Sequence, residues 1–261
     1  MKAYVLAAGY ATRLYPLTVN RPKPLLELGG RPLLSYLVDR LSALPGLREV
    51  VVIGNHKFHA QFTAWADTTA ASVPLHVLDD GSMSDEDKLG ALGDLDFALR
   101  SSPPEPGEDL VVLAGDNWLG FELEPVREAF EQQGRRTLLT VRDLGAVPPG
   151  PSPYNEVTTD GQDRVIRFRE KPSEPTTSLV AIALYFFPPT IPDLLRHYLE
   201  QGGNSDAPGR FIEWLVQHAP VRCHPLDGEW LDIGSHETLA EARRLFDPDG
   251  TTESPEDTGP R

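Results

Sequence analysis

The fold is decided by a stretch near the start of the chain, residues 4–34, which read YVLAAGYATRLYPLTVNRPKPLLELGGRPLL. Its first residues, YVLAA, form an apolar run that is typical of a buried strand. The segment that follows is far longer than an ordinary turn and has little helical character before residue 31. A connection of this length after a first strand is expected to bind something. Three cations lie within it: Arg13, Arg21 and Lys23.

Strand and helix patterns alternate over the first half of the chain. Strands are predicted over residues 49–53, 75–78 and 110–113, and helices over residues 33–44, 58–65 and 89–99. The strands are unbroken apolar runs rich in β-branched residues. Such strands, separated by helices, indicate a parallel sheet covered on both faces.

The second half of the chain has a different pattern. Strands are predicted over residues 137–141, 155–169 and 179–187, with a hairpin turn at Asp160-Gly161. Helices over 191–200, 210–217 and 236–246 and two short strands, 220–226 and 229–233, complete the chain. Residues 247–261 are acidic and have no apolar periodicity. We therefore expect one domain over residues 1–246 and an acidic disordered tail over 247–261.

Composition excludes several classes of function. The 261 residues carry a formal net charge of −15, which argues against nucleic-acid binding and against an anionic membrane surface. An anionic substrate would have to be captured by a local cluster of cations. Cys223 is the single cysteine, so no internal disulfide can form, and no long apolar segment is present. We expect a soluble cytoplasmic protein.

Two candidate sites follow predicted strands. Ligands of open α/β sheets bind at the carboxyl ends of the strands. The loop over residues 9–23 follows the first strand and offers close backbone approach and cations, which suit a polyphosphate. Asp116, in Gly115-Asp116-Asn117, follows the strand over 110–113 and offers a carboxylate to hydrated Mg²⁺. The phosphate-binding motif G-x-x-x-x-G-K-[ST] is absent from the sequence.

Four motifs together resemble the sugar-1-phosphate nucleotidyltransferases, including the glucose-1-phosphate thymidylyltransferases. The long segment over residues 6–34 resembles L-A-G-G-x-G-T-R-L-x-P-L-T-x-x-x-P-K-P-L. AGDN (114–117), REKP (169–172) and WLDIGS (230–235) follow in the family's order, so the resemblance covers residues 2–246. It implies a Rossmann-like three-layer α/β sandwich with a mixed, mostly parallel central sheet.

The resemblance also implies a reaction. The phosphate oxygen of a sugar 1-phosphate, or of a similar cyclitol phosphate, attacks the α-phosphorus of a nucleoside triphosphate in line, and pyrophosphate leaves. Catalysis of this kind consists mainly of positioning and charge neutralisation, assisted by Mg²⁺. The expected partners are therefore a nucleoside triphosphate and a sugar 1-phosphate, with no nucleic acid and no membrane. The family forms monomers and homo-oligomers, and the sequence leaves the oligomeric state open.

Matching positions in this sequence receive the family's roles. The implied catalytic residues are Arg13, Lys23, Asp116 and Lys171. The implied nucleotide-binding residues are Ala8, Gly9, Tyr10, Ala11, Thr12 and Gly90, the last giving the nucleobase room to approach the backbone. Asp116 and Asp232 would hold Mg²⁺. Glu170 would bind sugar hydroxyls and Lys171 the sugar phosphate.

Two departures from the family pattern affect the site. Ala11 stands where the family usually has glycine, so we expect either a negative φ or mild strain there. YNEV, residues 154–157, stands where many members have Tyr-Gly-Val, so Asn155 and Glu156 replace the glycine. Asn155 is expected to bind a sugar hydroxyl, with Glu156 as an additional acceptor.

Two other functions remain open at this point. One is a cytidylyltransferase that acts on phosphocholine or another non-sugar phosphate. The other is a catalytically silent protein that binds nucleotide sugars. The intact REKP and WLDIGS motifs favour a sugar-like acceptor, and the retained cations and carboxylates favour an enzyme. The nucleobase, the sugar and the pathway are left undetermined.

Overall fold

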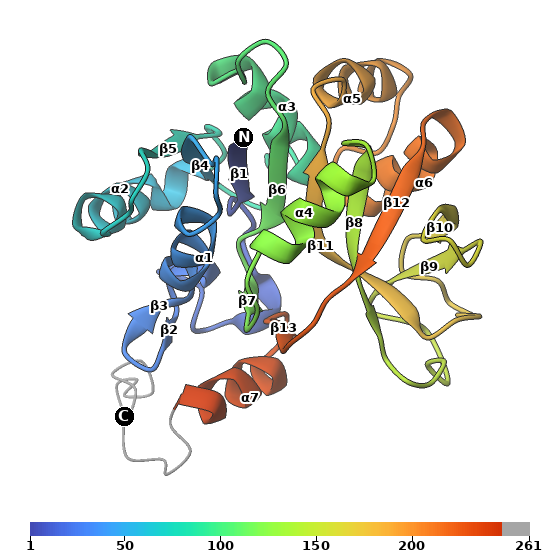
Figure 1. The fold of residues 1–261 in the computed structure, drawn as a ribbon. Helices are drawn as coiled ribbons and strands as arrows, with labels where there is room; N and C mark the ends of the chain where they lie inside the picture. Colours follow the sequence, from blue (N-terminus) through green and yellow to red (C-terminus); the bar gives the residue numbers. More distant parts are fainter. Residues whose placement is uncertain (247–261) are drawn as a thin grey trace.

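The computed structural model describes residues 1–246, so the tail expected over 247–261 lies outside the described residues. Its centre is a mixed nine-stranded sheet with helices on both faces (Figure 1). This architecture confirms the fold class that the sequence predicts.

One half of the sheet is parallel. Its strands lie in the order β6 (Leu110–Ala114), β1 (Lys2–Leu6), β4 (Glu49–Gly54) and β5 (Leu75–Asp79). Leu6, the last residue of β1, is in register with Ile53 and with Ala114. The carboxyl ends of these strands therefore meet at one edge of the sheet, and the loops that leave them meet there too.

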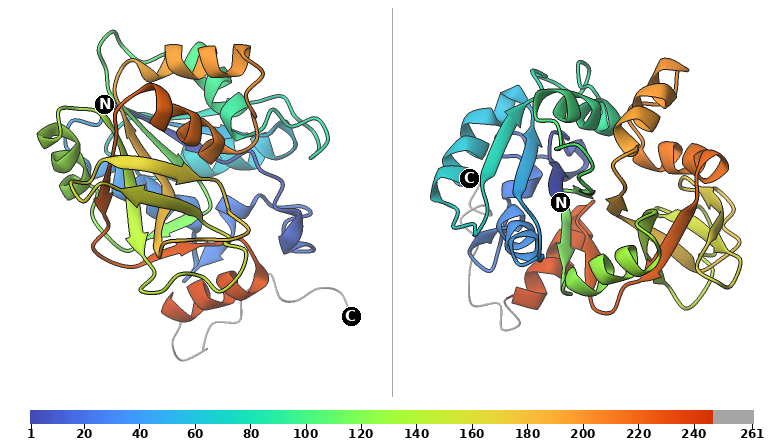
Figure 2. Two further views of the ribbon diagram at one scale, coloured as in Figure 1. Left: turned by 90° about the vertical axis from the view of Figure 1, so that its right-hand side faces the viewer. Right: turned by 45° about the horizontal axis from the view of Figure 1, so that its top comes forward.

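The other half is mainly antiparallel and lies on the side of the molecule away from α2 (Figures 1 and 2). Its strands are β11 (Leu179–Phe187), β8 (Thr137–Asp143), β9 (Asn155–Thr159), β10 (Val165–Arg169) and β12 (Val221–Pro225). β11 joins the two halves because it pairs with β6 as well as with β8 and β9. β9 and β10 form the hairpin predicted around residues 160–161.

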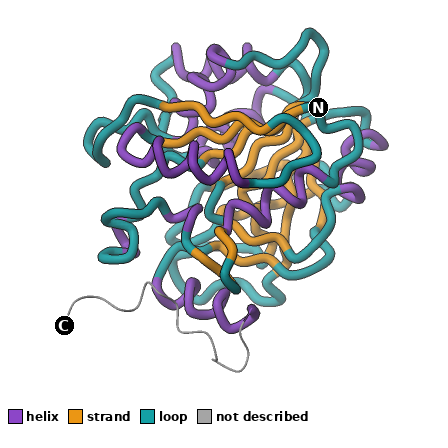
Figure 3. Tube along the Cα trace, turned by 90° about the vertical axis from the view of Figure 1, so that its left-hand side faces the viewer, coloured by secondary structure: helices purple, strands orange, loops and turns teal. Residues whose placement is uncertain are grey.

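Helices cover both faces, and the sheet runs through the middle of the molecule (Figure 3). Alternate residues of β1 enter different cores: Ala3 and Val5 pack on one face and Tyr4 on the other. The first face is covered by α1 (Leu33–Ser42), α2 (His59–Thr68) and α4 (Glu124–Gln132). The second is covered by α3 (Ala91–Ser101), α5 (Ile191–Glu200) and α6 (Pro208–His218).

A third apolar cluster anchors the long segment after β1. Leu14 and Leu26 from this segment pack with Ile233 and with residues of α7 (His236–Phe246). Two small sheets complete this region: β2 (Glu27–Leu28) with β3 (Arg31–Pro32), and β7 (Asn117–Leu119) with β13 (Trp230–Asp232). Residues 233–246 thus pack against the long loop that follows β1 and hold it in place. None of the helices described above has the length and apolar character of a membrane-spanning segment.

Candidate active site

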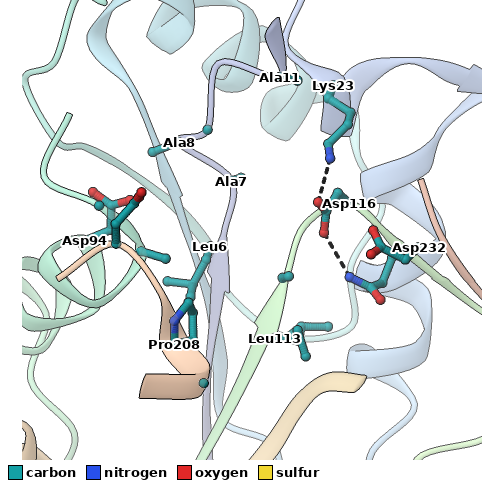
Figure 4. Close-up of a pocket in the computed structure, with 18 of the residues that line it drawn as sticks. Leu6, Ala7, Ala8, Ala11, Lys23, Asp94, Leu113, Asp116, Pro208 and Asp232 are labelled. Carbon is teal, nitrogen blue, oxygen red and sulfur yellow. Dashed lines mark hydrogen bonds and ion pairs between the residues drawn. The ribbon is translucent and has the colours of Figure 1, made fainter. Parts of the chain in front are cut away.

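A cavity of about 450 Å³ lies at the carboxyl edge of the sheet, over the ends of β1 and β6. The residues that the sequence implies as catalytic, nucleotide-binding, substrate-binding or metal-binding all line it, whereas Glu156 does not. Figure 4 shows Leu6, Ala7 and Ala8 at the end of β1 in the middle of this pocket, with Lys23, Asp116 and Asp232 to one side and Asp94 to the other. The predicted positions, which are far apart in the sequence, are therefore brought together.

The loop after β1 contributes its backbone to the pocket. Ala11 adopts a left-handed conformation, with φ 49° and ψ 45°, so the second of the two expected outcomes, strain, is the one found. Such a conformation costs an alanine on the order of 1 kcal/mol. It is stabilised because the Ala11 carbonyl accepts hydrogen bonds from the Leu14 N–H at 2.9 Å and from the Thr18 hydroxyl at 2.8 Å.

Asn55, which the sequence analysis missed, also holds this loop. It follows β4 directly and is fully buried. Its side-chain Nδ2 donates to the Ala8 carbonyl at 2.8 Å, and its Oδ1 accepts from the Phe58 N–H at 3.0 Å. In the sequence, the available signal was an asparagine close to the end of a predicted strand. Its role depends on the neighbouring strand and so could not be seen in the sequence.

Tyr10 connects the same loop to the segment after β5. Its hydroxyl lies 3.0 Å from the Ser82 hydroxyl, and Ser82 donates to both carboxylate oxygens of Asp80, at 2.8 and 2.9 Å. The two loops on this side of the pocket therefore share one hydrogen-bond network.

Lys23, Asp116 and Asp232 form the charged centre of the pocket. Lys23 Nζ lies 2.5 Å from Asp116 Oδ2, while Asn117 Nδ2 donates to the other carboxylate oxygen of Asp116 at 2.9 Å. Antiparallel pairing of β7 with β13 sets Asp232 in register with Asn117. The indole N–H of Trp230 donates to Asn117 Oδ1 at 2.5 Å and fixes the orientation of that amide. The two predicted metal ligands are thus adjacent.

The two carboxyls have opposite electrostatic environments. Burial works to raise the pKa of Asp116, but the neighbouring Lys23 ammonium outweighs it, and the pKa lies below its ordinary value. Burial and the charge of Asp116 raise the pKa of Asp232, against the influence of Lys23, Lys171 and Arg13. The Asp232 carboxyl therefore stands among three cations, which together form an anion-binding centre.

The oxygen donors in this centre fit Mg²⁺. Mg²⁺ is usually held by one or two carboxylates, with phosphate oxygens and water completing its coordination. Asp116 and Asp232 supply two such carboxylates on one wall of the pocket. Across residues 1–246, no group of three or more His, Cys, Asp or Glu side chains forms a metal site, so a dedicated all-protein cage is not among the described features.

Glu170 and Lys171 line the pocket directly after the end of β10. The Lys171 backbone has a φ of 39°, and its N–H donates to Asn155 Oδ1 at 3.2 Å. Burial raises the pKa of Glu170, even though Lys171 and Arg210 are nearby. Within residues 1–246, the buried Glu170 Oε2 has no hydrogen-bond partner.

Gly209 makes room for Glu170 and was not predicted from the sequence. A Cβ atom at Gly209, near the start of α6, would lie 1.7 Å from Glu170 Oε2 and 2.7 Å from Asn155 Nδ2. The carboxylate therefore packs against the beginning of a helix, where backbone N–H groups favour negative charge.

Glu156 is not the additional acceptor that the sequence suggested. It is 2% exposed, and its carboxylate is taken by Arg169, with Nε and Nη2 at 2.8 and 2.6 Å, and by Thr176. The ion pair fastens the turn over residues 169–176, which carries Glu170 and Lys171.

Gly90 lines the pocket, and the structure gives a further reason for glycine there. Its φ is 81°, and a Cβ would lie 2.7 Å from the Ser205 carbonyl oxygen and 2.8 Å from Asp206 Cα. The same Ser205 carbonyl accepts from the Leu92 N–H at 2.8 Å. Close packing of the segment before α6 on the start of α3 thus requires glycine at this position.

Comparison with known proteins gives consistent results. A family model described as nucleotidyl transferase matches residues 2–247. A putative mannose-1-phosphate guanyltransferase of Sulfolobus acidocaldarius is 30% identical over 236 residues, covering 90% of this chain and 60% of its own length. A glucose-1-phosphate thymidylyltransferase of Streptomyces antibioticus is 26% identical over 250 residues, covering 94% of this chain and 65% of its own. The chain thus spans about two thirds or less of these relatives.

Solved structures share the fold. A putative glucose-1-phosphate thymidylyltransferase from Bacillus anthracis aligns with a TM-score of 0.77 at 19% identity, over 97% of this chain and 98% of the other. A UDP-glucose pyrophosphorylase complexed with UDP-glucose aligns with a TM-score of 0.77 at 16% identity, over 94% of this chain and 97% of the other. At these identities the likeness concerns the fold alone.

Proposed function

Because the chain belongs to the nucleotidyl transferase family, we propose that it transfers a nucleoside monophosphate from a nucleoside triphosphate to a sugar 1-phosphate, or to a similar cyclitol phosphate. The products are a nucleoside-diphosphate sugar and pyrophosphate. In this proposal residues 1–246 act as one catalytic domain. The curated relatives described above are named for reactions with sugar 1-phosphates, which supports this acceptor over phosphocholine.

The observation that carries the proposal is the arrangement of Lys23, Asp116 and Asp232, with Lys171 and Arg13 close enough to influence Asp232. Three cations around a pair of carboxylates suit two anionic substrates that must approach each other. A catalytically silent binding protein has no need for this carboxylate pair. Two carboxylates repel phosphate groups unless a metal ion binds to both the carboxylates and the phosphates.

We assign the residues the roles that the resemblance implies, and their positions around one pocket support this assignment. The backbone over residues 8–12 contacts the β- and γ-phosphates, and Arg13 neutralises the leaving pyrophosphate. Lys23 contacts the triphosphate where charge develops during transfer. Lys171 binds the sugar phosphate and directs its oxygen at the α-phosphorus, while Glu170 and Asn155 bind sugar hydroxyls. Holding both reactants in line supplies most of the rate enhancement in a reaction of this kind.

Asp116 and Asp232 would hold Mg²⁺, which neutralises charge on the phosphates when bound. Asp116 also pairs with Lys23. Lys23 is therefore held beside the carboxylates, within the pocket where the nucleotide's phosphates would bind. We place this reaction in the cytoplasm, where nucleoside triphosphates are abundant.

A screen for pyrophosphate release tests the proposal. Nucleoside triphosphates are crossed with a panel of sugar 1-phosphates and with phosphocholine, with Mg²⁺ and with a chelator. The proposal predicts release that requires Mg²⁺ and a sugar 1-phosphate. Release with phosphocholine alone would favour the cytidylyltransferase, and binding of nucleotide sugars without any release would favour the silent protein.

A further inference from the structure

Asp94 is a buried acid in the pocket that the proposed reaction does not use. It lies in the first turn of α3, where its N–H donates to the Gly90 carbonyl at 2.8 Å. The residue is 6% exposed, yet it lines the pocket, on the wall opposite Lys23 and Asp116 (Figure 4). Within residues 1–246, its Oδ1 atom has no hydrogen-bond partner. A buried carboxylate oxygen without a partner lacks a donor, and a ligand in the adjoining cavity is one source of such a donor.

The surroundings of Asp94 are acidic. Burial and the neighbouring carboxylates of Asp80 and Asp206 raise the pKa of Asp94 to about 8, and Lys88 opposes them only in part. Lys88 is shared, since its Nζ lies 3.1 Å from Asp85 Oδ1 and 3.4 Å from Asp206 Oδ2. A carboxyl in this position destabilises the fold when it is ionised. An exposed acid in the first turn would complement the helix dipole equally well, so helix stability does not explain the burial.

Charge separates the two sides of the pocket. Arg13, Lys23 and Lys171 act on Asp232, whereas Asp94 is surrounded by acids and a shared lysine. Phosphate groups are attracted to the first side and repelled from the second. The group that lies against Asp94 is therefore uncharged and rich in hydrogen-bond donors. A nucleobase meets this description, and Ala8, Gly90 and Asp94 line the same pocket.

We infer that Asp94 determines the nucleobase and that it selects guanine. This inference rests on the proposed function. Guanine presents two adjacent donors, its ring N1–H and its amino group, and an ionised Asp94 carboxylate turned toward the cavity offers two acceptor oxygens to them. Adenine and cytosine present one amino group beside an acceptor nitrogen. Uracil and thymine present one N–H between two carbonyl oxygens, which a carboxylate repels.

The same match predicts a pH dependence. Guanine requires the ionised carboxylate, which Asp80 and Asp206 disfavour and Lys88 favours. The affinity for GTP should rise, relative to that for UTP, as the pH passes upward through the pKa of Asp94. An amide at this position does not titrate and offers one donor and one acceptor.

Equilibrium binding of nucleotides tests the inference independently of turnover. Isothermal titration calorimetry, at a pH above the pKa of about 8 of Asp94, compares GTP, ATP, CTP, UTP and dTTP on the wild-type chain, on Asp94→Asn and on a control, Asp96→Asn. Asp96 lies on the same helix and pairs with Arg100 at 2.8 Å. We expect the wild type and the control to bind GTP about tenfold or more tightly than UTP, and Asp94→Asn to bind the two within about threefold, because a bidentate base contact is lost.

Several outcomes would overturn the inference. They are a wild type without preference for GTP, an Asp94→Asn variant that keeps the preference or weakens all five nucleotides equally, and a changed preference among sugars instead of bases. If the wild type prefers another base and still forms a nucleotide sugar, this inference alone fails. If it binds GTP preferentially and forms no nucleotide sugar, the proposed function fails and the inference stands.

Discussion

Lys23 Nζ lies 2.5 Å from Asp116 Oδ2, so the long loop after β1 is joined to the end of β6 by an ion pair at the centre of the pocket. The pair balances a carboxylate that burial would otherwise leave destabilised. It also holds the Lys23 ammonium in the part of the pocket where we propose that the nucleotide's phosphates bind.

Removing Lys23 should affect both stability and catalysis. In Lys23→Ala the Asp116 carboxylate loses its cation, and we expect a stability loss of about 1–3 kcal/mol, since an uncompensated charge is left partly buried. Pyrophosphate release should fall about a hundredfold or more, because a group that stabilises developing charge is gone. Thermal denaturation and a release assay measure the two effects.

Arg21→Ala is the matched control for this change. Arg21 lies in the same loop and pairs with Glu27 at 2.9 Å on a partly exposed surface. Such pairs contribute about 0–1 kcal/mol. A loss of turnover in Arg21→Ala as large as in Lys23→Ala would contradict the role given to the Lys23–Asp116 pair.

Asp232→Asn should separate stability from activity. The raised pKa of Asp232 means that the folded state binds more protons than the unfolded state, between the ordinary pKa and the raised one. The carboxyl therefore lowers stability as the pH rises through that window, and the amide removes this decline. We expect Asp232→Asn, without Mg²⁺, to melt at or above the temperature of the wild type at neutral pH, with its Mg²⁺-dependent turnover abolished. A lower melting temperature together with retained turnover would refute this account of Asp232.

Ala11→Gly tests the strain in the loop. Replacing the left-handed alanine removes strain from the folded state and raises the free energy of unfolding by about 1 kcal/mol. The greater conformational freedom of glycine in the unfolded chain lowers it again by about 0.4–1 kcal/mol. We expect stability and turnover equal to or slightly above those of the wild type. Ala64→Gly, at an exposed position in α2, should instead cost about 1 kcal/mol. Equal losses in both variants would show that Ala11 is not strained.

Gly209→Ala should impair the acceptor side of the pocket. The added Cβ would collide with Glu170 Oε2 and displace that carboxylate. We expect the kcat/KM for the sugar phosphate to fall about tenfold to a hundredfold, through misplacement of the acceptor, with little change in the KM for the nucleotide. Gly150→Ala is the control, since a Cβ there meets nothing within 4 Å. An increase in the nucleotide KM alone would contradict the assignment.

Much of the fold could be predicted from the sequence because the apolar periodicity is strong. The predicted limits of α5 and α7 agree with the structure, and the parallel strands lie where unbroken apolar runs occur. α4 was not predicted, because its buried residues, Val126, Ala129 and Phe130, are few among charged neighbours. β7 and β13 are short, and their pairing joins segments far apart in the chain, which no local pattern reveals.

The candidate site could be predicted where motifs carry it and not where packing does. Asp116 stands in a recognisable motif at the end of β6, and Lys23 stands in the motif of the long loop after β1. Gly209 and Asn55 matter because of what lies against them in three dimensions: Glu170 in one case and the Ala8 carbonyl in the other. Asp94 occupies an ordinary helical position, and only its burial at the pocket wall distinguishes it.

Transfer of a labelled phosphate tests the central claim most directly. The wild type and Asp116→Asn are incubated with Mg²⁺, a sugar 1-phosphate and a nucleoside triphosphate labelled at either the α- or the γ-phosphorus. The account predicts that wild type moves the α-label into a nucleotide sugar and the γ-label into pyrophosphate, while folded Asp116→Asn moves neither. Appearance of the γ-label in the sugar product, or undiminished transfer by Asp116→Asn, would contradict it.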